Sequence, residues 1–260
     1  MPQPLIIIGT SGNALDILDI VEATNRVVPT WDLAGFLDDS RPAGSKFHGI
    51  EVLGGLRDAT RHTGCLFVNA IGSDRSFRKR PELIAQTKLE RDRFATLIHP
   101  LSAVSSRATL GPGTCVNPGV TVAGGVTVGA HVWLGSSCVI GHESVIDDCA
   151  MIAPRAVLSW FVRVGVAVYV GGGACIRQRV TIGERALIGL GGVVIADVAP
   201  NTTVVGNPAR VLVRVPRQQG KPGDTPPPQP GISETPPGPR PGLPDRSGPG
   251  MGDEAGGLRS

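Results

Sequence analysis

Aliphatic residues recur at every sixth position through the middle of the chain, from Ile98 to Val194, and each position of this register holds Val, Ile or Leu. The next residue is often Gly or Asn, and the residue two before it is usually small or Val. A six-residue period is the signature of a hexapeptide β-helix, in which each repeat is a short strand and a turn. We expect the aliphatic to point inward and Gly or Asn to take the positive φ of the turn.

Three hexapeptides make one triangular coil, and stacked coils lie about 4.8 Å apart, as paired strands do. The register therefore predicts that Val122 lies over Val104 and under Ile140. It also predicts that the repeat stops at Val194, because Pro200 takes the next position and residues 201–205 have no coil to continue. A solenoid has to hide its end, and residues 211–215 are the expected capping strand.

Before residue 98 the pattern changes. Short apolar runs, as expected for buried strands, alternate with segments expected to be helical, which is typical of a small α/β domain. The expected strands are residues 4–8, 33–37, 49–55, 66–71 and 94–98, and the expected helices are 14–23 and 74–90, the latter with Arg75, Arg78, Lys79 and Arg80 on its surface. The loop Gly9-Thr10-Ser11-Gly12-Asn13 joins the first strand to the first helix. Such loops hold phosphates through backbone N–H groups, but this one lacks the full G-x-G-x-x-G, so a tight turn without a ligand stays open.

Acidic and imidazole side chains mark two candidate sites. Asp38 and Asp39 end the second strand, where carboxylates can accept hydrogen bonds from a ribose or base, although a solvated turn is the simpler alternative. His142 comes two residues after an inward aliphatic and is followed by Glu143. A carboxylate beside an imidazole can raise its basicity and fix its tautomer, as a general base requires.

Composition narrows the range of possible functions and locations. The net charge is +3, without a dense basic patch, so nucleic acid is not indicated as a partner. The five Cys are odd in number and form no CxxC, which favours reduced cytosolic thiols. No signal peptide and no membrane span are expected, and the predicted location is cytoplasmic. From residue 216 to residue 260, Pro, Gly and charged residues predict a disordered tail.

Several motifs occur in the order seen in the hexapeptide-repeat sugar acyltransferases of the sialic acid O-acetyltransferase and UDP-4-amino-sugar N-acetyltransferase type, which the chain resembles. They are Gly9-Thr10-Ser11-Gly12-Asn13, Gly35-Phe36-Leu37-Asp38-Asp39, Gly49 with Val52-Leu53-Gly54, Ala70-Ile71-Gly72 with Arg78, Ile98-His99-Pro100, Ile140-Gly141-His142-Glu143 and Val205-Gly206-Asn207-Pro208-Ala209. The resemblance implies a Rossmann-like nucleotide-sugar-binding domain (residues 1–97) and a left-handed parallel β-helix with its C-terminal cap (98–215), followed by the tail (216–260).

The resemblance also implies an acetyl-CoA-dependent acetyltransferase that modifies an amine or hydroxyl of a sugar or nucleotide-sugar, in surface glycan biosynthesis. It implies a homotrimer, with acetyl-CoA between adjacent prisms and no metal. His142 would be the general base, tuned by Glu143, and a backbone N–H one coil away would stabilise the oxyanion. The acceptor would contact Ser11, Gly12, Asn13, Asp38, Asp39 and Gly54, and acetyl-CoA would contact Met151, Trp160, Gly172 and Leu190.

Three residues depart from the family pattern. Asn13 stands where the family loop usually ends in His, Trp160 where the coil above the catalytic His usually has Gly, and Met151 where a His often contacts the coenzyme. A diverged or non-catalytic trimeric scaffold therefore stays open as an alternative. A metal hydratase of the carbonic anhydrase kind would need three converging His, and the spacing of His99, His131 and His142 does not make such a set evident.

Overall fold

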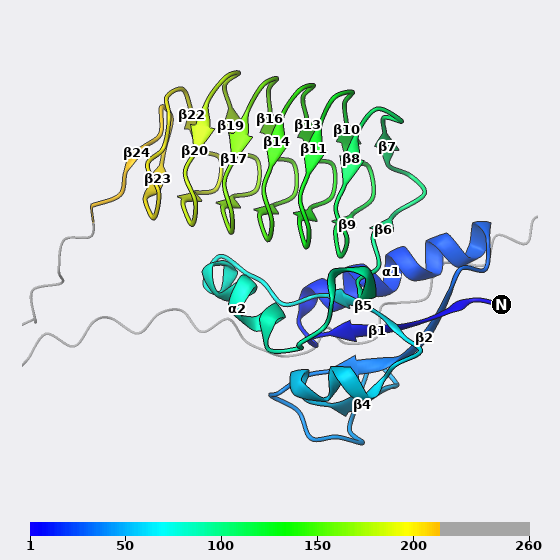
Figure 1. The fold of residues 1–260 in the computed structure, drawn as a ribbon. Coiled ribbons are helices and arrows are strands. Elements are labelled where there is room, and N and C mark those ends of the chain that lie inside the picture. The colour runs from blue at the N-terminus through cyan, green and yellow to red at the C-terminus, as the bar shows by residue number, and fades with distance from the viewer. Residues whose placement is uncertain (214–260) are drawn as a thin grey trace, which may run out of the picture. The chain divides into compact units, whose positions relative to one another are not determined.

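The N-terminal part of the chain is an α/β unit (Figure 1), and the computed structural model describes residues 1–213. The expected tail lies outside the described residues. Five strands form one sheet in the order β3-β4-β2-β1-β5, in which only β3 is antiparallel to its neighbour. They are β1 (Gln3–Ile8), β2 (Trp31–Leu37), β3 (Lys46–Phe47), β4 (Ile50–Gly54) and β5 (Leu66–Asn69). The connection from β1 to β2 is α1 (Gly12–Val27), which packs through Ala14, Ile17, Ile20 and Val21. The unit is Rossmann-like, as predicted.

The second predicted helix, residues 74–90, is wrong in its length. The segment forms the short 3-10 helix η2 (Phe77–Lys79) and then α2 (Arg80–Ala85), with Pro81 in the first turn. Further 3-10 turns are η1 (Leu56–Arg61) and η3 (Arg91–Arg93). Lys88 has a φ of 53°, which ends the helical path. Arg80 is buried and not on the surface, so periodicity misplaced this side chain.

The rest of the described chain is a β-helix of three sheets (Figure 1), in which all strands except the last, β24, are parallel to their neighbours. The fold class is the predicted left-handed parallel β-helix. The eight-stranded sheet contains β6 (Leu97–Ile98), β9 (Cys115–Val116), β12 (Trp133–Leu134), β15 (Met151–Ile152), β18 (Tyr169–Val170), β21 (Leu187–Ile188), β23 (Thr203–Val205) and β24 (Arg210–Val211). The six-stranded sheet contains β7 (Ala103–Val104), β10 (Thr121–Val122), β13 (Val139–Ile140), β16 (Val157–Leu158), β19 (Cys175–Ile176) and β22 (Val193–Val194). The five-stranded sheet contains β8 (Thr109–Leu110), β11 (Thr127–Val128), β14 (Val145–Ile146), β17 (Arg163–Val164) and β20 (Thr181–Ile182).

The predicted stacking register is confirmed. Val122 pairs with Val104 on one side and with Ile140 on the other. The inward aliphatics form one continuous buried core along the prism. Where the small position is polar, it is satisfied: the Thr114 hydroxyl donates to the Gly129 carbonyl and accepts from the Val132 amide. The sequence register therefore translates directly into a spatial one.

The predicted source of positive φ is wrong. From residue 113 to residue 191, the third residue after each aliphatic has a positive φ, whether it is Gly, Glu143, Phe161 or Arg179. The Gly directly after the aliphatic has a different reason to be there. A Cβ on Gly141 would lie 2.6 Å from the Ser159 carbonyl carbon of the next coil, so this Gly permits close stacking of the turns.

The repeat also continues beyond its predicted end at Val194. Val198 forms a bridge with Ile182, and Val204 pairs with Ile188 in β23. Both offsets are sixteen residues and not eighteen, because one turn is two residues shorter than the others. Strand β24 then pairs antiparallel to β23 and closes the end, one residue earlier than the predicted capping strand begins.

The outward side chains of the three sheets differ. The covered face, on the eight-stranded sheet, packs into one core with α1 and β1 and consists of Cys115, Trp133, Met151 and Tyr169. The open face, on the six-stranded sheet, has apolar side chains that remain accessible or half-buried, namely Val139, Val157, Cys175 and Val193. The five-stranded sheet has a more polar outer face, namely Thr127, Val145, Arg163 and Thr181.

Candidate functional site

The turns between the six-stranded and five-stranded sheets form the His142 corner, which comprises residues 141–143, 159–161 and 177–179. His142 is exposed there, and Trp160 lies one coil above it, as the register predicts. The two rings are parallel, with an interplanar angle of 2° and centroids 5.9 Å apart. The Phe161 ring meets the imidazole edge-on at 5.4 Å. Within residues 1–213 the imidazole makes no hydrogen bond, so these ring contacts define its position.

Glu143 directs its carboxylate toward the coil below. A Cβ on Gly125 would clash with Glu143 Oε1, which shows how closely the carboxylate covers this Gly. The structure contains no hydrogen bond between Glu143 and the His142 ring. Glu143 instead lines a cavity of about 210 Å³ together with Phe161, Arg163, Arg179 and Thr181.

A backbone donor lies beside His142. The Trp160 amide has no hydrogen-bond partner among residues 1–213, whereas its neighbours donate to the adjacent coils, Ser159 to Ile176 and Phe161 to His142. A Cβ on Gly141 would lie 2.8 Å from this amide nitrogen. Gly141 therefore leaves the free N–H of Trp160 unobstructed on the same corner as the imidazole.

The four predicted acetyl-CoA contacts do not come together within this single chain. Trp160 lies on the His142 corner. Gly172 and Leu190 lie on a second corner, between the eight-stranded and six-stranded sheets, where a Cβ on Gly172 would lie 3.4 Å from Leu190. Met151 is buried on the covered face, and its sulfur would lie 2.6 Å from a Cβ on Gly72. The two corners border opposite edges of the open face.

The first loop contributes a second candidate site, a cavity of about 330 Å³ at the carboxyl ends of β1, β2 and β5. It is lined by Gly9, Thr10, Ser11, Asp38, Ser40, Ile71, Gly72, Ser73 and Ser76. The Ser11 hydroxyl donates to the Ala70 carbonyl at 2.9 Å, and the Asn13 amide donates to Ala70 and Gly72 at 3.1 and 2.9 Å. Gly12 begins α1, whose first turn has no acidic residue. These contacts hold the loop in place, and the N-terminus of α1 lies at the edge of the cavity, where Ser11 lines it.

Asp38 is occupied by the protein itself. Its carboxylate accepts from the Thr10 amide and hydroxyl at 2.7 and 2.5 Å, and from the Ser40 amide and hydroxyl at the same two distances. Burial opposes ionisation, but the hydrogen bonds from Ser40 and Thr10 outweigh it and hold the pKa of Asp38 below its ordinary value. Asp38 therefore shapes the loop.

Asp39 and Gly54 lie beside the first-loop cavity, but neither is among its lining residues. Asp39 accepts from the Leu56 amide at 2.8 Å, at the start of η1. Gly54 pairs with Leu37, and a Cβ there would lie 2.5 Å from Asp58 Oδ2. Both residues therefore support the strand ends around the cavity.

Sequence reasoning missed several polar residues of this cavity, among them Thr10, Ser40, Ser73 and Ser76. Arg41 was missed too: its Nε donates to the Thr10 hydroxyl at 2.9 Å. Their position in the sequence could have indicated them, because they directly follow β1, β2 and β5. The carboxyl ends of neighbouring parallel strands meet at one edge of a sheet, which is where ligands bind in such folds.

The junction of the two parts buries a positive charge. Arg80 donates to the carbonyls of Ile71 and His131, the latter at 2.6 Å, and its Nε has no partner among the described residues. His131 packs edge-on against Phe94. Burial, and then the Arg80 charge, lowers the pKa of His131 to about 4. His131 is thus a neutral structural residue at neutral pH.

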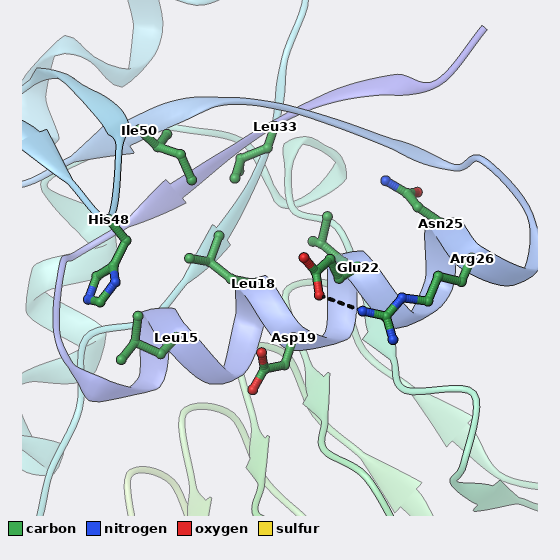
Figure 2. A pocket seen from close by; sticks show the side chains of 10 residues that line it. Leu15, Leu18, Asp19, Glu22, Asn25, Arg26, Leu33, His48 and Ile50 are labelled. Carbon is green, nitrogen blue, oxygen red and sulfur yellow. Dashed lines mark hydrogen bonds and ion pairs between the residues drawn. The ribbon is translucent and has the colours of Figure 1, made fainter. Parts of the chain in front are cut away.

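A groove of about 880 Å³ follows the outer side of α1, and sequence reasoning did not anticipate it. Figure 2 shows Leu15 and Leu18 of α1 facing Leu33 and Ile50, with the Glu22–Arg26 ion pair at one end. None of the predicted site residues lines this groove. Elsewhere in residues 1–213, no three His, Cys, Asp or Glu side chains lie together as a metal site would require, and no helix of that segment is long and apolar enough to cross a membrane.

Comparison with known proteins supports both parts of the architecture. The PglD N-terminal domain model matches residues 4–81. The acetyltransferase domain of PglB from Neisseria gonorrhoeae FA1090, solved with acetyl coenzyme A, is similar with a TM-score of 0.69 and 29% identity, over 82% of this chain and 100% of that one. A variant of perosamine N-acetyltransferase from Caulobacter crescentus, solved with CoA and GDP-perosamine, gives 0.71 and 26%, over 81% and 97%.

A curated relative matches a shorter stretch. Serine acetyltransferase 3, mitochondrial, of Arabidopsis thaliana is 50% identical over 50 residues, which are 19% of this chain and 13% of the relative. The chain thus spans only a small part of that protein's length.

The fold and the His142 corner together define the class of protein. It is a β-helix protein with a Rossmann-like N-terminal sheet and an exposed histidine on one corner of the β-helix. Within that class, the chain is similar to hexapeptide-repeat sugar acetyltransferases in its N-terminal domain and in the solved structures that it matches.

Proposed function

We propose that the protein transfers an acetyl group from acetyl-CoA to an amine or hydroxyl of a sugar or nucleotide-sugar, in surface glycan biosynthesis. One observation carries the proposal. An exposed imidazole, His142, and a backbone N–H without a partner, that of Trp160, lie one coil apart on the same corner. Acyl transfer needs this pair, a base for the nucleophile and a donor for the oxyanion.

In the proposed reaction, a His142 ring nitrogen takes the proton of the acceptor amine or hydroxyl as that group attacks the thioester carbonyl. The Trp160 N–H donates to the carbonyl oxygen as negative charge develops there. The carbon–sulfur bond then breaks, and the CoA thiolate leaves and takes up the proton from His142. Glu143, the residue after His142, belongs to the same proposal as the second member of the catalytic pair.

We further propose that the donor lies between copies of the chain in a homotrimer. The open face is apolar and uncovered in the single chain, with Val139 38% exposed and Val157 36% exposed. Its two edges carry three of the four predicted coenzyme contacts, Trp160 on one edge and Gly172 with Leu190 on the other. Packing the open face against another copy would bring Gly172 and Leu190 of one copy toward His142 and Trp160 of the next, where acetyl-CoA would then bind.

The first-loop cavity is the proposed place for the nucleotide part of the acceptor. The N-terminus of α1 offers unpaired N–H groups to a diphosphate, and Arg41 adds a positive charge beside Thr10. GDP-perosamine, with which the Caulobacter relative was solved, is a nucleotide-sugar of the expected kind. Residues 1–97 as acceptor domain, residues 98–215 as transfer domain and a cytoplasmic location belong to the same proposal.

The test is release of free CoA from acetyl-CoA, measured by chromatography with a panel of nucleotide-linked 4-amino-sugars, free amino sugars and sialic acid. We expect acceptor-dependent release, reduced about 10²-fold to 10⁴-fold in His142→Ala. His62→Ala is the control. It removes a half-buried histidine that is distant from His142 in the sequence, and it should keep the parent's rate of CoA release. A non-catalytic scaffold would give no acceptor-dependent release with any member of the panel. Equal rates in His142→Ala and the parent would reject the assignment of the base.

A further inference from the structure

Two aromatic side chains stand in the coil directly above His142. Trp160 covers one face of the imidazole in a parallel stack, and Phe161 approaches its edge. The remaining surface of the indole lines a cavity of about 510 Å³ with Arg177, Gln178 and Asp197. The His142 ring makes no hydrogen bond within residues 1–213, and its aromatic contacts are with these two rings.

The aromatic pair is itself held by the coils below and above it. The Phe161 amide donates to the His142 carbonyl at 3.0 Å, and the Arg179 amide donates to the Trp160 carbonyl at 3.1 Å. The Arg179 guanidinium lies over the Phe161 ring, 4.8 Å from its centroid. Phe161 has a φ of 58°, a left-handed conformation that is uncommon for a bulky residue and is held here by the coil register.

We propose that Trp160 is a positioning residue that holds the His142 imidazole in its reactive orientation by stacking, in place of the hydrogen-bonded carboxylate that usually orients a catalytic histidine. This inference rests on the proposed function. The backbone of Trp160 and its side chain then have separate tasks: the N–H faces the oxyanion, and the indole orients the base. A misdirected base lowers the rate of proton transfer more than it lowers donor binding.

The experiment compares Trp160→Gly, Trp160→Phe and the matched control Val166→Gly in the full chain. All three keep the backbone N–H at position 160. Val166 is an exposed side chain at the equivalent turn position of the next corner, so its removal tests for general loosening of the coil. The first readout is the NMR shift of the His142 ring protons, identified by their loss in His142→Ala.

We expect the His142 signals to move downfield in Trp160→Gly, because the ring current of the stacked indole is removed. They should move less in Trp160→Phe and not at all in Val166→Gly. The second readout is steady-state kinetics: kcat should fall roughly 10-fold to 100-fold in Trp160→Gly, a larger factor than any rise in the KM for acetyl-CoA. Trp160→Phe should recover most of kcat.

Unchanged His142 signals in Trp160→Gly would overturn the proposal, as would an unchanged kcat or an equal loss in Val166→Gly. A loss confined to KM would also overturn it, because the indole would then bind substrate and not orient the base. Absence of CoA release from the parent chain would reject the proposed function and the catalytic meaning of the stack, while the NMR signals would still report whether the stack exists.

Discussion

The covered and open faces of the β-helix have the same repeat and the same apolar outward positions, but different surroundings. Trp133 on the covered face is 4% exposed, because α1 and β1 pack against it. Val157 on the open face is 36% exposed, and no part of residues 1–213 shields it to that degree. The difference teaches that a hexapeptide register determines which residues point outward, whereas the neighbouring elements determine what each outward face does.

The largest expected effect is on the covered face. Trp133→Ala should lower the free energy of unfolding by about 3–5 kcal/mol, because it leaves a cavity among buried residues. Val157→Ala on the open face should cost under about 1 kcal/mol in the isolated chain. Urea unfolding followed by circular dichroism, at a concentration low enough to exclude association, measures both. Similar costs for the two variants would contradict the contrast between the faces.

The next effect is a pH dependence at the covered junction. The pKa of His131 is about 4 in the folded chain, below its ordinary value of 6.5, so the unfolded chain binds an additional proton between these values. Stability should therefore fall as pH falls from about 6.5 toward 4, by about 2–3 kcal/mol at pH ~4.5.

The matched variant for this test is His131→Asn, since Asn tolerates the left-handed φ of 57° at that position. Its unfolding free energy should depend less on pH over the same interval than that of the parent. Parallel pH curves for the two proteins would show that His131 is not the group responsible.

A smaller effect is expected where the loop after β5 contacts the β-helix. A Cβ on Gly72 would lie 2.6 Å from the sulfur of Met151 and equally close to Arg80. Gly72→Ala should therefore cost about 1–3 kcal/mol, measured by thermal unfolding. Gly173→Ala is the control, because it has a positive φ but nothing within 4 Å of its Cβ. If Gly173→Ala lowers the stability more than Gly72→Ala does, backbone conformation and not close packing determines the cost of replacing these glycines.

The smallest expected effect on the fold, and the sharpest on assembly, comes from Val157→Asp. A charge at this position of the open face should leave the helical and strand signals unchanged and abolish the proposed trimer. Light scattering during size exclusion measures the mass. Thr127→Asp, an outward position of the five-stranded sheet, should remain trimeric. A trimer that survives Val157→Asp would place the interface elsewhere.

Much of the fold follows from the sequence because a period of six leaves few alternatives. The register correctly stacks Val122 between Val104 and Ile140, and it places Trp160 above His142. It could not reveal the left-handed φ of Phe161 or Arg179, since every turn imposes that conformation at the same position whatever the residue. It also missed the shortened turn before Val198, where the hexad resumes with two residues fewer.

The candidate site was predictable in position but not in its bonding. Sequence placed Asp38 near the first loop, but four hydrogen bonds from Thr10 and Ser40 depend on how two strand ends meet. Arg80 looked like a surface residue of a long helix. Only the packing of the loop after β5 against the solenoid buries it between the Ile71 and His131 carbonyls.

In the proposed reaction this chain moves an acetyl group to a sugar, and His142 performs the proton transfer. The most direct measurement supplies acetyl-CoA with a deuterated acetyl group and follows the acceptor by mass spectrometry, for the parent chain and for His142→Ala. We expect an acceptor that gains one deuterated acetyl group with the parent, and a rate at least about 100-fold lower with the variant. An acceptor that gains no label with the parent, or gains it equally fast with both proteins, would contradict this proposal.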